Sequence, residues 1–283
     1  VMQPWWILKK GWQLYRKYKF DLMTVHEYPP FYNGIGARLL WQRIKVPYVL
    51  EIHHIPGHPK AADFKEWLYK IATRFFIKYD AAKARAVRVV NQKQAPEFLI
   101  KAGVPKEKIV CAPSFYIGLE TFKPIGMEKR YDLVFVARLE KNKGIHLLLE
   151  AIRIVKLQSP NVKVLIIGSG PLKDEIQKYI REHKLENNVF LSGWLETLGD
   201  VARAYNSARV FISPSFNEGG PRVVFEAMAC GLPVITTRVG VTPDIIEDGV
   251  SGLFTDWDPR QMADKILYLL NEQKLQKRFS QIG

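Results

Sequence analysis

Residues 211–231 read FISPSFNEGGPRVVFEAMACG, and this stretch decides the fold expected for the chain. A short apolar strand, Val210 to Ile212, runs into a loop at Ser213–Gly220. Pro221 is favoured in the first turn of a helix and Gly231 is common just past a helix end, so we predict a helix between them. Strand, loop and helix in this order form the repeating unit of a parallel sheet covered by helices.

Two glutamates flank the start of this predicted helix. Glu218 lies in the loop, and Glu226 lies about two turns later. Most glutamates on helices are solvated surface, but the surrounding EAMACG is small and apolar, so this helix should pack and Glu226 should need a partner. The N–H groups at the helix start favour an anion. The pair therefore suits a ligand with hydroxyls at both ends and phosphates in the middle, which is the shape of a nucleotide sugar.

The composition is that of a globular protein. The chain has 283 residues, 47% hydrophobic and 25% charged, enough for one large domain or two of ordinary size. No apolar run reaches the roughly 18 residues of a membrane span, and VMQPWWILKK does not resemble a signal peptide. We therefore expect a cytoplasmic protein. Cys111 and Cys230 lie in apolar surroundings and are expected to be buried free thiols.

The net charge of +14 favours polyanionic partners such as nucleic acid, anionic lipid or phosphorylated substrates. No nucleic-acid-binding motif is recognisable, so nucleic acid is not expected as a partner. Residues 5–19 predict a basic helix with Trp and Tyr on its apolar side. That side could lie in an anionic membrane surface or pack on the protein's own sheet.

Strands and helices alternate in two series. The first series has apolar strands within 20–30, 47–57, 86–91 and 108–113, with helices at about 34–44, 62–80 and 92–103. The second has strands Asp132–Ala137, Val162–Ile167, Val189–Leu191, Val210–Ile212 and Val234–Thr236, with helices beginning near Gly144, Pro171, Leu198 and Pro221. The restart predicts two doubly wound domains, residues 1–125 and 126–283.

Ligands of such sheets bind at the carboxyl ends of the strands. The residues expected at that edge of the second domain are Arg138, Lys143, Gly168, Gly170 and Glu218. Each is weak evidence alone, since a lone arginine is usually solvated and a lone Gly-x-Gly is usually a turn. Five of them at one edge predict a binding site.

The same residues resemble a known family. The order VARLEKNKGIHLLLEA, IIGSGP, FLSGW and SPSFNEGGPRVVFEAMACGLPVITTRVGVTPDIIEDGVSGL is similar to the donor half of glycosyltransferase family 4, with Glu218 and Glu226 as its E-x7-E element. The resemblance is dense over 131–257 and looser over 20–124. It implies the α/β GT-B fold, in which two Rossmann-like domains face a cleft, here with an incomplete N-terminal domain.

The resemblance also implies residue roles. Arg138 and Lys143 would hold the donor diphosphate, Glu218 the transferred sugar, and Glu226 the ribose. The backbone of the cleft would be formed by Gly168, Gly170, Gly193, Gly219 and Gly220. A histidine at the tip of the strand VLEIHH would lie near the reacting sugar; His53 is favoured, and His54 remains open.

The implied activity is transfer of a sugar, with retention and without a metal or other cofactor, from a nucleotide-diphosphate sugar such as a UDP-sugar to a glycan or lipid-linked acceptor. The enzyme would act in the cytoplasm, attached peripherally at the inner face of the plasma membrane. Alternatives are a nucleotide-sugar-binding module without transfer activity and a sugar-nucleotide epimerase of the same fold.

The sequence departs from the family pattern at three places. Pro221 replaces part of a Phe-Gly pair and removes a backbone N–H. APSFYIGLETF stands where many members have P-N-G-V-D. The usual opening strand with its Gly-rich loop and the usual closing helix are not evident, so we expect a fragment or an unusually short member.

Overall fold

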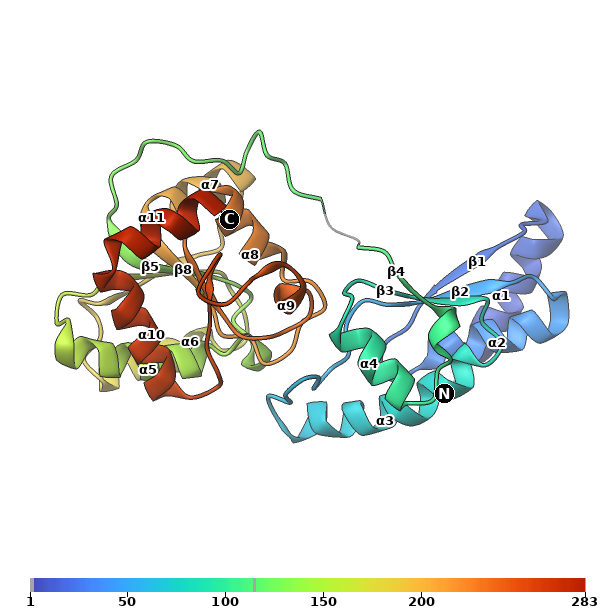
Figure 1. The fold of residues 1–283 in the computed structure, drawn as a ribbon. Helices are drawn as coiled ribbons and strands as arrows, with labels where there is room; N and C mark the ends of the chain where they lie inside the picture. Colours follow the sequence, from blue (N-terminus) through green and yellow to red (C-terminus); the bar gives the residue numbers. More distant parts are fainter. Residues whose placement is uncertain (1–2, 114–115, 283) are drawn as a thin grey trace. The chain divides into compact units, whose positions relative to one another are not determined.

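The computed structural model describes residues 3–113 and 116–282, which form two compact units (Figure 1). The first unit comprises Val1–Ser114 with two short loops, Asn217–Gly220 and Val239–Asp244, and the second comprises the rest of the chain. Each unit is built on one parallel sheet. The predicted α/β architecture is therefore confirmed. No helix within the described residues is long and apolar enough to cross a membrane.

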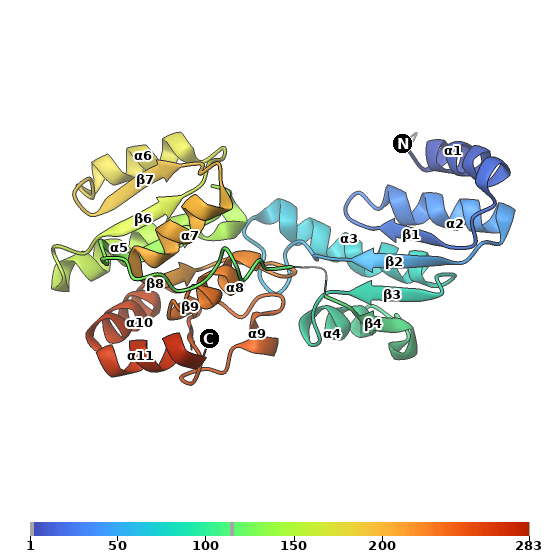
Figure 2. The same cartoon turned by 90° about the horizontal axis from the view of Figure 1, so that it is seen from above.

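The first unit contains a four-stranded sheet in the order β1-β2-β3-β4, seen side by side in Figure 2. Its elements are α1 Gln3–Tyr18, β1 Met23–His26, α2 Tyr32–Ile44, β2 Tyr48–Ile52, α3 Phe64–Ala81, β3 Ala86–Val89, α4 Gln94–Lys101, a short 3-10 turn Lys106–Lys108 and β4 Ile109–Cys111. Successive strands of the chain are parallel neighbours in the sheet, so every connection crosses over in the same direction. When all of these crossovers are right-handed, the connecting helices lie on one face of the sheet, as Figure 1 shows.

The strands of the first sheet alternate in burial because only one face is covered by helices. In β2, Tyr48, Leu50 and Ile52 are buried, whereas Val49 and Glu51 are only partly buried. The buried side chains pack against α2, α3 and α4 through residues such as Ile77 and Leu99. The hydrophobic core of this unit therefore lies between the sheet and one helical layer.

Helix α1 packs on α2. Gly11 of α1 faces the side chain of Leu40, and a Cβ added to Gly36 of α2 would lie 2.8 Å from the Cβ of Ile7. A side chain at Gly36 would collide with the base of the Ile7 side chain, whereas one at Gly11 would displace only the end of the Leu40 side chain. The apolar side predicted for residues 5–19 thus contacts α2 through Ile7 and Trp12, which are half-buried, whereas Trp5 and Trp6 remain 64% exposed.

The second unit contains a six-stranded sheet in the order β10-β9-β8-β5-β6-β7. Its elements are β5 Tyr131–Val136, a 3-10 turn Lys141–Lys143, α5 Ile145–Gln158, β6 Val164–Ile167, α6 Lys173–Glu182, β7 Val189–Gly193, α7 Leu198–Asn206, β8 Ala208–Ser213, α8 Arg222–Ala229, β9 Val234–Thr236, β10 Leu253–Phe254, α10 Pro259–Asn271 and α11 Gln273–Ile282. The short helix α9 Thr242–Ile245 follows β9 in the chain and belongs mostly to the first unit. The chain winds outward from β5 to β7, then returns to β8 and winds the other way. This is a doubly wound sheet whose topological switch point lies between β5 and β8.

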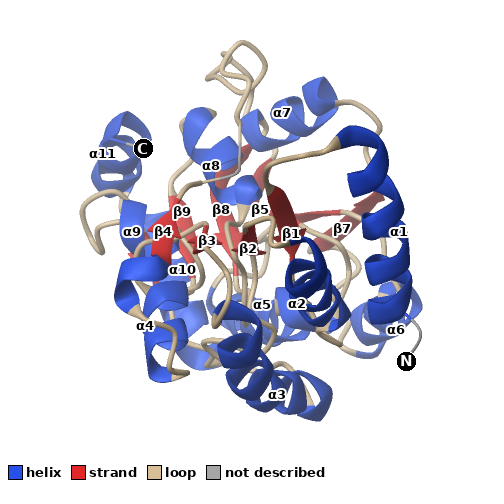
Figure 3. Cartoon of the chain, turned by 90° about the vertical axis from the view of Figure 1, so that its right-hand side faces the viewer, coloured by secondary structure: helices blue, strands red, loops and turns tan. Residues whose placement is uncertain are grey.

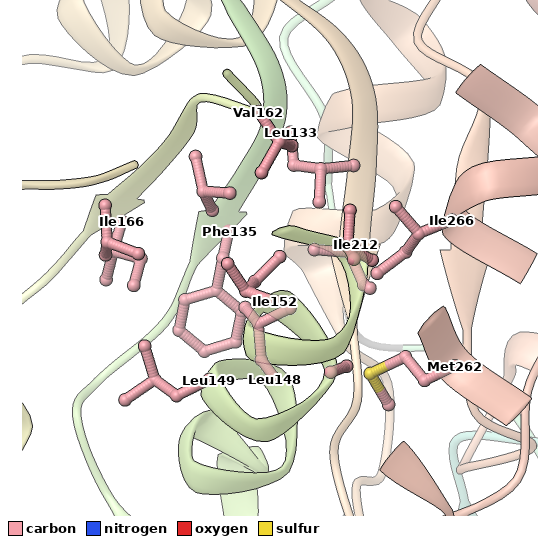
Figure 4. Packing of buried hydrophobic residues seen from close by; sticks show 14 of the residues in the cluster. Leu133, Phe135, Leu148, Leu149, Ile152, Val162, Ile166, Ile212, Met262 and Ile266 are labelled. Carbon is pink, nitrogen blue, oxygen red and sulfur yellow. The ribbon is translucent and has the colours of Figure 1, made fainter. Parts of the chain in front are cut away.

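Helices cover both faces of the second sheet (Figure 1). One core joins Leu133 and Phe135 of β5 to α5, α6 and α10, and Figure 4 shows Leu148, Leu149 and Ile152 of α5 around Phe135. The other core joins the opposite face of the sheet to α7 and α8. Because both faces are buried, the strands read as continuous apolar runs, and this made them easy to predict.

One cysteine differs from expectation. Cys230 is buried as predicted, but Cys111 is exposed, because it lies in β4 at an edge of the first sheet. The domain bounds 1–125 and 126–283 stay a prediction. Phe122 is buried in the second unit beside Tyr205, at a ring-centroid distance of 6.2 Å.

The first unit also buries two carboxyl groups beneath α2. Glu27 is 2% exposed and Asp80 is 0% exposed. A Cβ placed on Gly34 would touch the carboxyl groups of both, so the two face one point of α2. Burial raises the pKa of Glu27 to about 7; burial and the neighbouring Glu27 raise the pKa of Asp80 to about 8, against an opposing effect of Arg38. In the folded protein the pair therefore keeps its protons to a higher pH than solvated carboxyl groups do.

This pair predicts that stability falls as the pH rises. Unfolded carboxyls lose their protons near pH 4, whereas the folded pair keeps them until about pH 7–8, so the folded state binds more protons in between and the free energy of unfolding decreases across that window. In Asp80→Asn the free energy of unfolding should fall less steeply with pH. At pH 8 it should exceed that of the wild type by about 1 kcal/mol or more. Urea unfolding at pH 5 and pH 8 measures this, with the exposed Glu128→Gln as control. Identical pH dependence in Asp80→Asn and wild type would contradict it.

Candidate functional site

The second unit has a cavity of about 300 Å³ at the carboxyl ends of β5 and β6. Its walls come from the ends of these strands, from the segment between β7 and α7, and from one side of α8. The lining residues are Val136, Ala137, Arg138, Ile167, Gly168, Trp194, Leu195, Glu196, Thr197, Leu198, Val201, Arg222, Val223 and Glu226. The cavity lies where ligands of doubly wound sheets bind.

Glu226 is the buried acid of this cavity. The residue is 4% exposed because α8 packs on the sheet through Val224 and Ala227. Its Oε2 accepts a hydrogen bond from the Tyr205 hydroxyl at 3.2 Å, and its Oε1 accepts one from Nε of Arg222 at 2.8 Å. The expectation that a glutamate in this packed helix needs partners is thus confirmed.

Tyr205 and Arg222 have different parts in holding this acid. Burial, followed by the Glu226 carboxylate, raises the pKa of Tyr205 well above its usual range, so the phenol stays a proton donor to Glu226. Arg222 is 55% exposed at its side chain and pairs with Glu226 one helical turn away. The carboxylate is therefore held by one buried donor and one donor that is open to solvent.

The predicted glycines separate into two groups. Gly168 lines the cavity, with φ +138°, and any side chain there would overlap the carbonyl oxygen of Ala137. Its N–H donates to the carbonyl of Gly193 at 2.9 Å. Gly170 instead packs on the backbone after β5, where a Cβ would lie 2.6 Å from the carbonyl oxygen of Leu139. Gly170 and Gly193 shape the turns around the cavity without lining it.

Arg138 and Lys143 follow β5. Arg138 lines the cavity with a 66% exposed side chain and forms an ion pair with Glu140 at 3.0 Å. Lys143 is partly buried in the 3-10 turn Lys141–Lys143 and is outside the cavity lining. The N–H of Phe216 donates to the carbonyl of Asn142 at 2.8 Å, which ties this turn to the segment after β8. The Lys143 backbone thus lies at the switch point.

The start of α8 borders the cavity through Arg222 and Val223. Pro221 precedes the helix without a side-chain cap, and the first turn of α8 contains no acid. A helix N-terminus of this kind favours an anion. The N–H that Pro221 lacks reduces the number of donors, as the sequence indicated.

Sequence reasoning missed part of the cavity wall. Arg222, Thr197 and Leu195 were not singled out, and Trp194, which is 69% exposed, appeared only as the last residue of the motif FLSGW. The four-residue spacing of Arg222 and Glu226 was a readable signal for their ion pair. Thr197 could have been recognised as a helix cap, since its side chain accepts the N–H of Asp200 at 3.1 Å.

The loop Asn217–Gly220 is grouped with the first unit, where it lies against the segment after β2. The Asn217 amide donates to Glu66 at 2.7 Å, and its Oδ1 lies 2.8 Å from Nε2 of His54. A Cβ on Gly219 would overlap the carbonyl oxygen of His53, so glycine is required by close backbone approach. Glu218 and Gly219 share a space of about 10 Å³ with His53 and His54. Gly220 is outside its lining.

The two candidate histidines point to different neighbours. The His53 ring lies 4.2 Å from the ring of His26, and its Nε2 lies 3.6 Å from Oε2 of Glu51. Burial, followed by His26, lowers the pKa of His53. His54 instead contacts Asn217. Both line the small space beside Glu218, so the structure brings both of the histidines considered from sequence to one place.

Comparison with known families decides the membership of the chain. The family model described as "Glycosyl transferases group 1" matches residues 119–283, and that described as "Glycosyl transferase 4-like domain" matches residues 4–114. The chain belongs to the group 1 glycosyltransferases. The resemblance to glycosyltransferase family 4 is thereby confirmed, and with it membership in a family of transferase enzymes.

Individual relatives agree with this assignment. An uncharacterized glycosyltransferase of Methanocaldococcus jannaschii is 27% identical over 269 residues, which cover 92% of this chain and 68% of that protein. The capsular polysaccharide biosynthesis glycosyltransferase CapM of Staphylococcus aureus is 33% identical over 159 residues, covering 56% and 41%. A variant of S. aureus TarM, solved with fondaparinux, α-GlcNAc-glycerol and UDP, has a TM-score of 0.72 at 25% identity and covers 97% and 53%. The expected GT-B fold of this group 1 member is confirmed.

Replacing the buried acid should weaken nucleotide binding by this glycosyltransferase. Glu226→Gln keeps the shape of the side chain but removes the charge that strengthens its hydrogen bonds, so the Kd of a nucleoside diphosphate should rise roughly tenfold or more. Isothermal titration with UDP, GDP and ADP measures this. Glu182→Gln on α6, away from the cavity, is the matched control and should bind as the wild type does. Equal Kd values for Glu226→Gln and wild type would show that the Glu226 carboxylate does not contribute to nucleotide binding.

Proposed function

We propose that this chain is a retaining glycosyltransferase that moves a sugar from a nucleoside-diphosphate sugar, such as a UDP-sugar, to a glycan or lipid-linked acceptor. The observation that carries the proposal is the cavity with the buried Glu226 carboxylate in its wall and the Arg138 guanidinium at its edge. A carboxylate accepts hydrogen bonds from ribose hydroxyls, and a guanidinium pairs with phosphate oxygens. These are the two chemistries that a nucleoside diphosphate presents.

In the proposed reaction the donor diphosphate is the leaving group. The bond from the sugar to the diphosphate breaks as the sugar gains oxocarbenium character. An acceptor hydroxyl attacks from the face that the diphosphate leaves, and its proton passes to an oxygen of the departing diphosphate. Arg138, Lys143 and the N–H groups of α8 would stabilise the negative charge that develops on the diphosphate. Two side-chain cations and a helix start would supply this charge in place of a metal ion or other cofactor.

Glu218 and its neighbours would position the transferred sugar. Glu218 would accept hydrogen bonds from the sugar hydroxyls, while Gly219 and Gly220 allow close approach of the backbone. Gly168, Gly170 and Gly193 would shape the nucleotide end through the turns that they form. His53, whose pKa is lowered mainly by burial and then by His26, would act as a neutral imidazole near the reacting sugar.

The substrate classes are supported by the relatives. A variant of TarM was solved with UDP and with α-GlcNAc-glycerol, and CapM is named for capsular polysaccharide biosynthesis. A lipid-linked acceptor would also fit the charge of the chain. The exposed Trp5 and Trp6 on the basic helix α1 support peripheral attachment to an anionic membrane surface, at the cytoplasmic face.

Product analysis tests this function directly. The protein is incubated with UDP-glucose, UDP-GlcNAc and GDP-mannose together with a lipid-extract acceptor, and the anomeric configuration of any product is read by NMR. Retained configuration supports the proposal. An inverted product would reject retention, and saturable nucleotide binding without turnover of any donor would indicate a binding module instead.

Removing the Lys143 ammonium should abolish most of the turnover. Lys143→Ala takes away a fixed positive charge expected at the leaving diphosphate, so kcat should fall on the order of 10²–10³-fold. Lys178→Ala, an exposed lysine on α6, should leave kcat unchanged. Excess EDTA should not change the wild-type rate if fixed cations replace a metal. A normal kcat in Lys143→Ala, or loss of activity in EDTA, would contradict this mechanism.

A further inference from the structure

Helix α3 exposes an apolar face on the first unit. Five side chains form what we call the α3 ridge: Phe64, Trp67, Leu68, Ile71 and Phe75. Their exposed fractions are 71%, 48%, 46%, 36% and 74%, in the same order. The helix runs along the lower margin of this unit in Figures 1 and 3. Single exposed apolar residues need no explanation, but a continuous stripe of large ones marks an interaction surface.

The ridge is separate from the face by which α3 packs. At about 100° per residue, its five positions fall within an arc of roughly 100° on one side of the helix. The buried residues Thr73, Ile77 and Ala81 occupy the opposite side. Packing within the protein therefore accounts for the inner face of α3 and leaves the aromatic outer face without a function in folding.

Every charged residue on the outer side of α3 is a cation. Lys65, Arg74 and Lys78 are exposed on this helix. Its two acids are turned away: Asp80 is 0% exposed, and Glu66 accepts a hydrogen bond from the N–H of Ala62 at 2.7 Å. A surface with an apolar centre and exclusively positive borders complements a partner that is apolar inside and negative at its surface.

We propose that the α3 ridge docks this protein on an anionic lipid bilayer. Phe and Trp side chains are favoured at the boundary between headgroups and acyl chains, and Lys and Arg beside them bind anionic headgroups. Phe64 and Trp67 stack at 5.4 Å, so they present one broad aromatic surface at the start of the helix. A partner protein would need a groove with acidic borders to match the same surface.

Helix α1, in the same helical layer, also combines exposed aromatic side chains with cations. Helix α1 packs on α2, which contacts α3 through Arg38, whose guanidinium lies 3.6 Å from the ring centroid of Tyr79. Helix α1 contains no acid and exposes Trp5 and Trp6. The α3 ridge adds a second membrane-binding element to the one proposed for residues 5–19. Vesicle binding does not depend on sugar transfer, so the two proposals can fail separately.

Vesicle flotation tests the ridge. The whole chain is mixed with vesicles of phosphatidylcholine alone or with vesicles that also contain about 30% phosphatidylglycerol, which gives a clearly anionic surface. The wild type should float with the anionic vesicles. Phe64→Ser/Phe75→Ser should bind them roughly tenfold more weakly, because two interfacial side chains are lost. Leu157→Ser/Tyr268→Ser, which changes exposed apolar residues of the second unit, is the matched control and should bind normally.

A variant with fewer cations measures the electrostatic contribution to vesicle binding. Arg74→Gln/Lys78→Gln should lower binding to anionic vesicles by about fivefold per cation and reduce its salt dependence. Lys173→Gln/Lys178→Gln on α6 removes the same net charge and should have little effect. Far-UV circular dichroism and the nucleotide-induced shift in Tm confirm that each variant is folded, since these changes are at the surface and away from the cavity.

Three outcomes would overturn the proposal. One is equal flotation of wild type and Phe64→Ser/Phe75→Ser. Another is loss of binding in Trp5→Ser/Trp6→Ser alone, which would assign the membrane contact to α1. The third is a dimer of the wild type that Phe64→Ser/Phe75→Ser converts to a monomer with vesicle binding unchanged, which would assign the ridge to a second copy of the chain.

Discussion

The cavity of the second unit depends on how a carboxylate can be buried in a packed helix. Helix α8 must cover the second sheet with Val224 and Ala227 and still keep Glu226 in the cavity wall. An unpaired buried carboxylate would be too costly, so Tyr205 of α7 and Arg222 of α8 both donate to it. These bonds fix α7 against α8. The shape of the cavity and the position of its acid therefore follow from one electrostatic requirement.

Close backbone approach sets the remaining geometry of the cavity. The turn after β6 lies so near the end of β5 that Gly168 has no room for a side chain beside the Ala137 carbonyl. Its N–H is already bonded to Gly193, so the turn is stiff before any ligand arrives. The turn Gly168–Gly170 thus contributes mainly by letting two strand ends meet. Arg138 emerges at this meeting point and reaches the cavity.

The sequence predicted the parts that depend on local pattern. Apolar runs fixed the strands from β1 to β9, and the E-x7-E spacing with an apolar helix pointed to a partnered Glu226. Side-chain direction at the edges of elements was less predictable. Cys111 lies in an apolar run but points outward from an edge strand, and Gly170 follows the same turn as Gly168 yet faces away from the cavity. The α3 ridge was missed because a helix that is apolar on several sides does not show from its sequence which side faces solvent.

The two units differ in how many of their large apolar side chains are buried, and the net charge of the chain bears on this difference. The second unit covers both faces of its sheet and buries most of its large apolar side chains between layers. The first unit covers one face only and leaves aromatic side chains of α1 and α3 in solvent. Such surfaces favour aggregation in a neutral protein, and mutual repulsion from a net charge of +14 opposes it. In the membrane docking that we propose for the α3 ridge, the same positive charge would also attract an anionic bilayer.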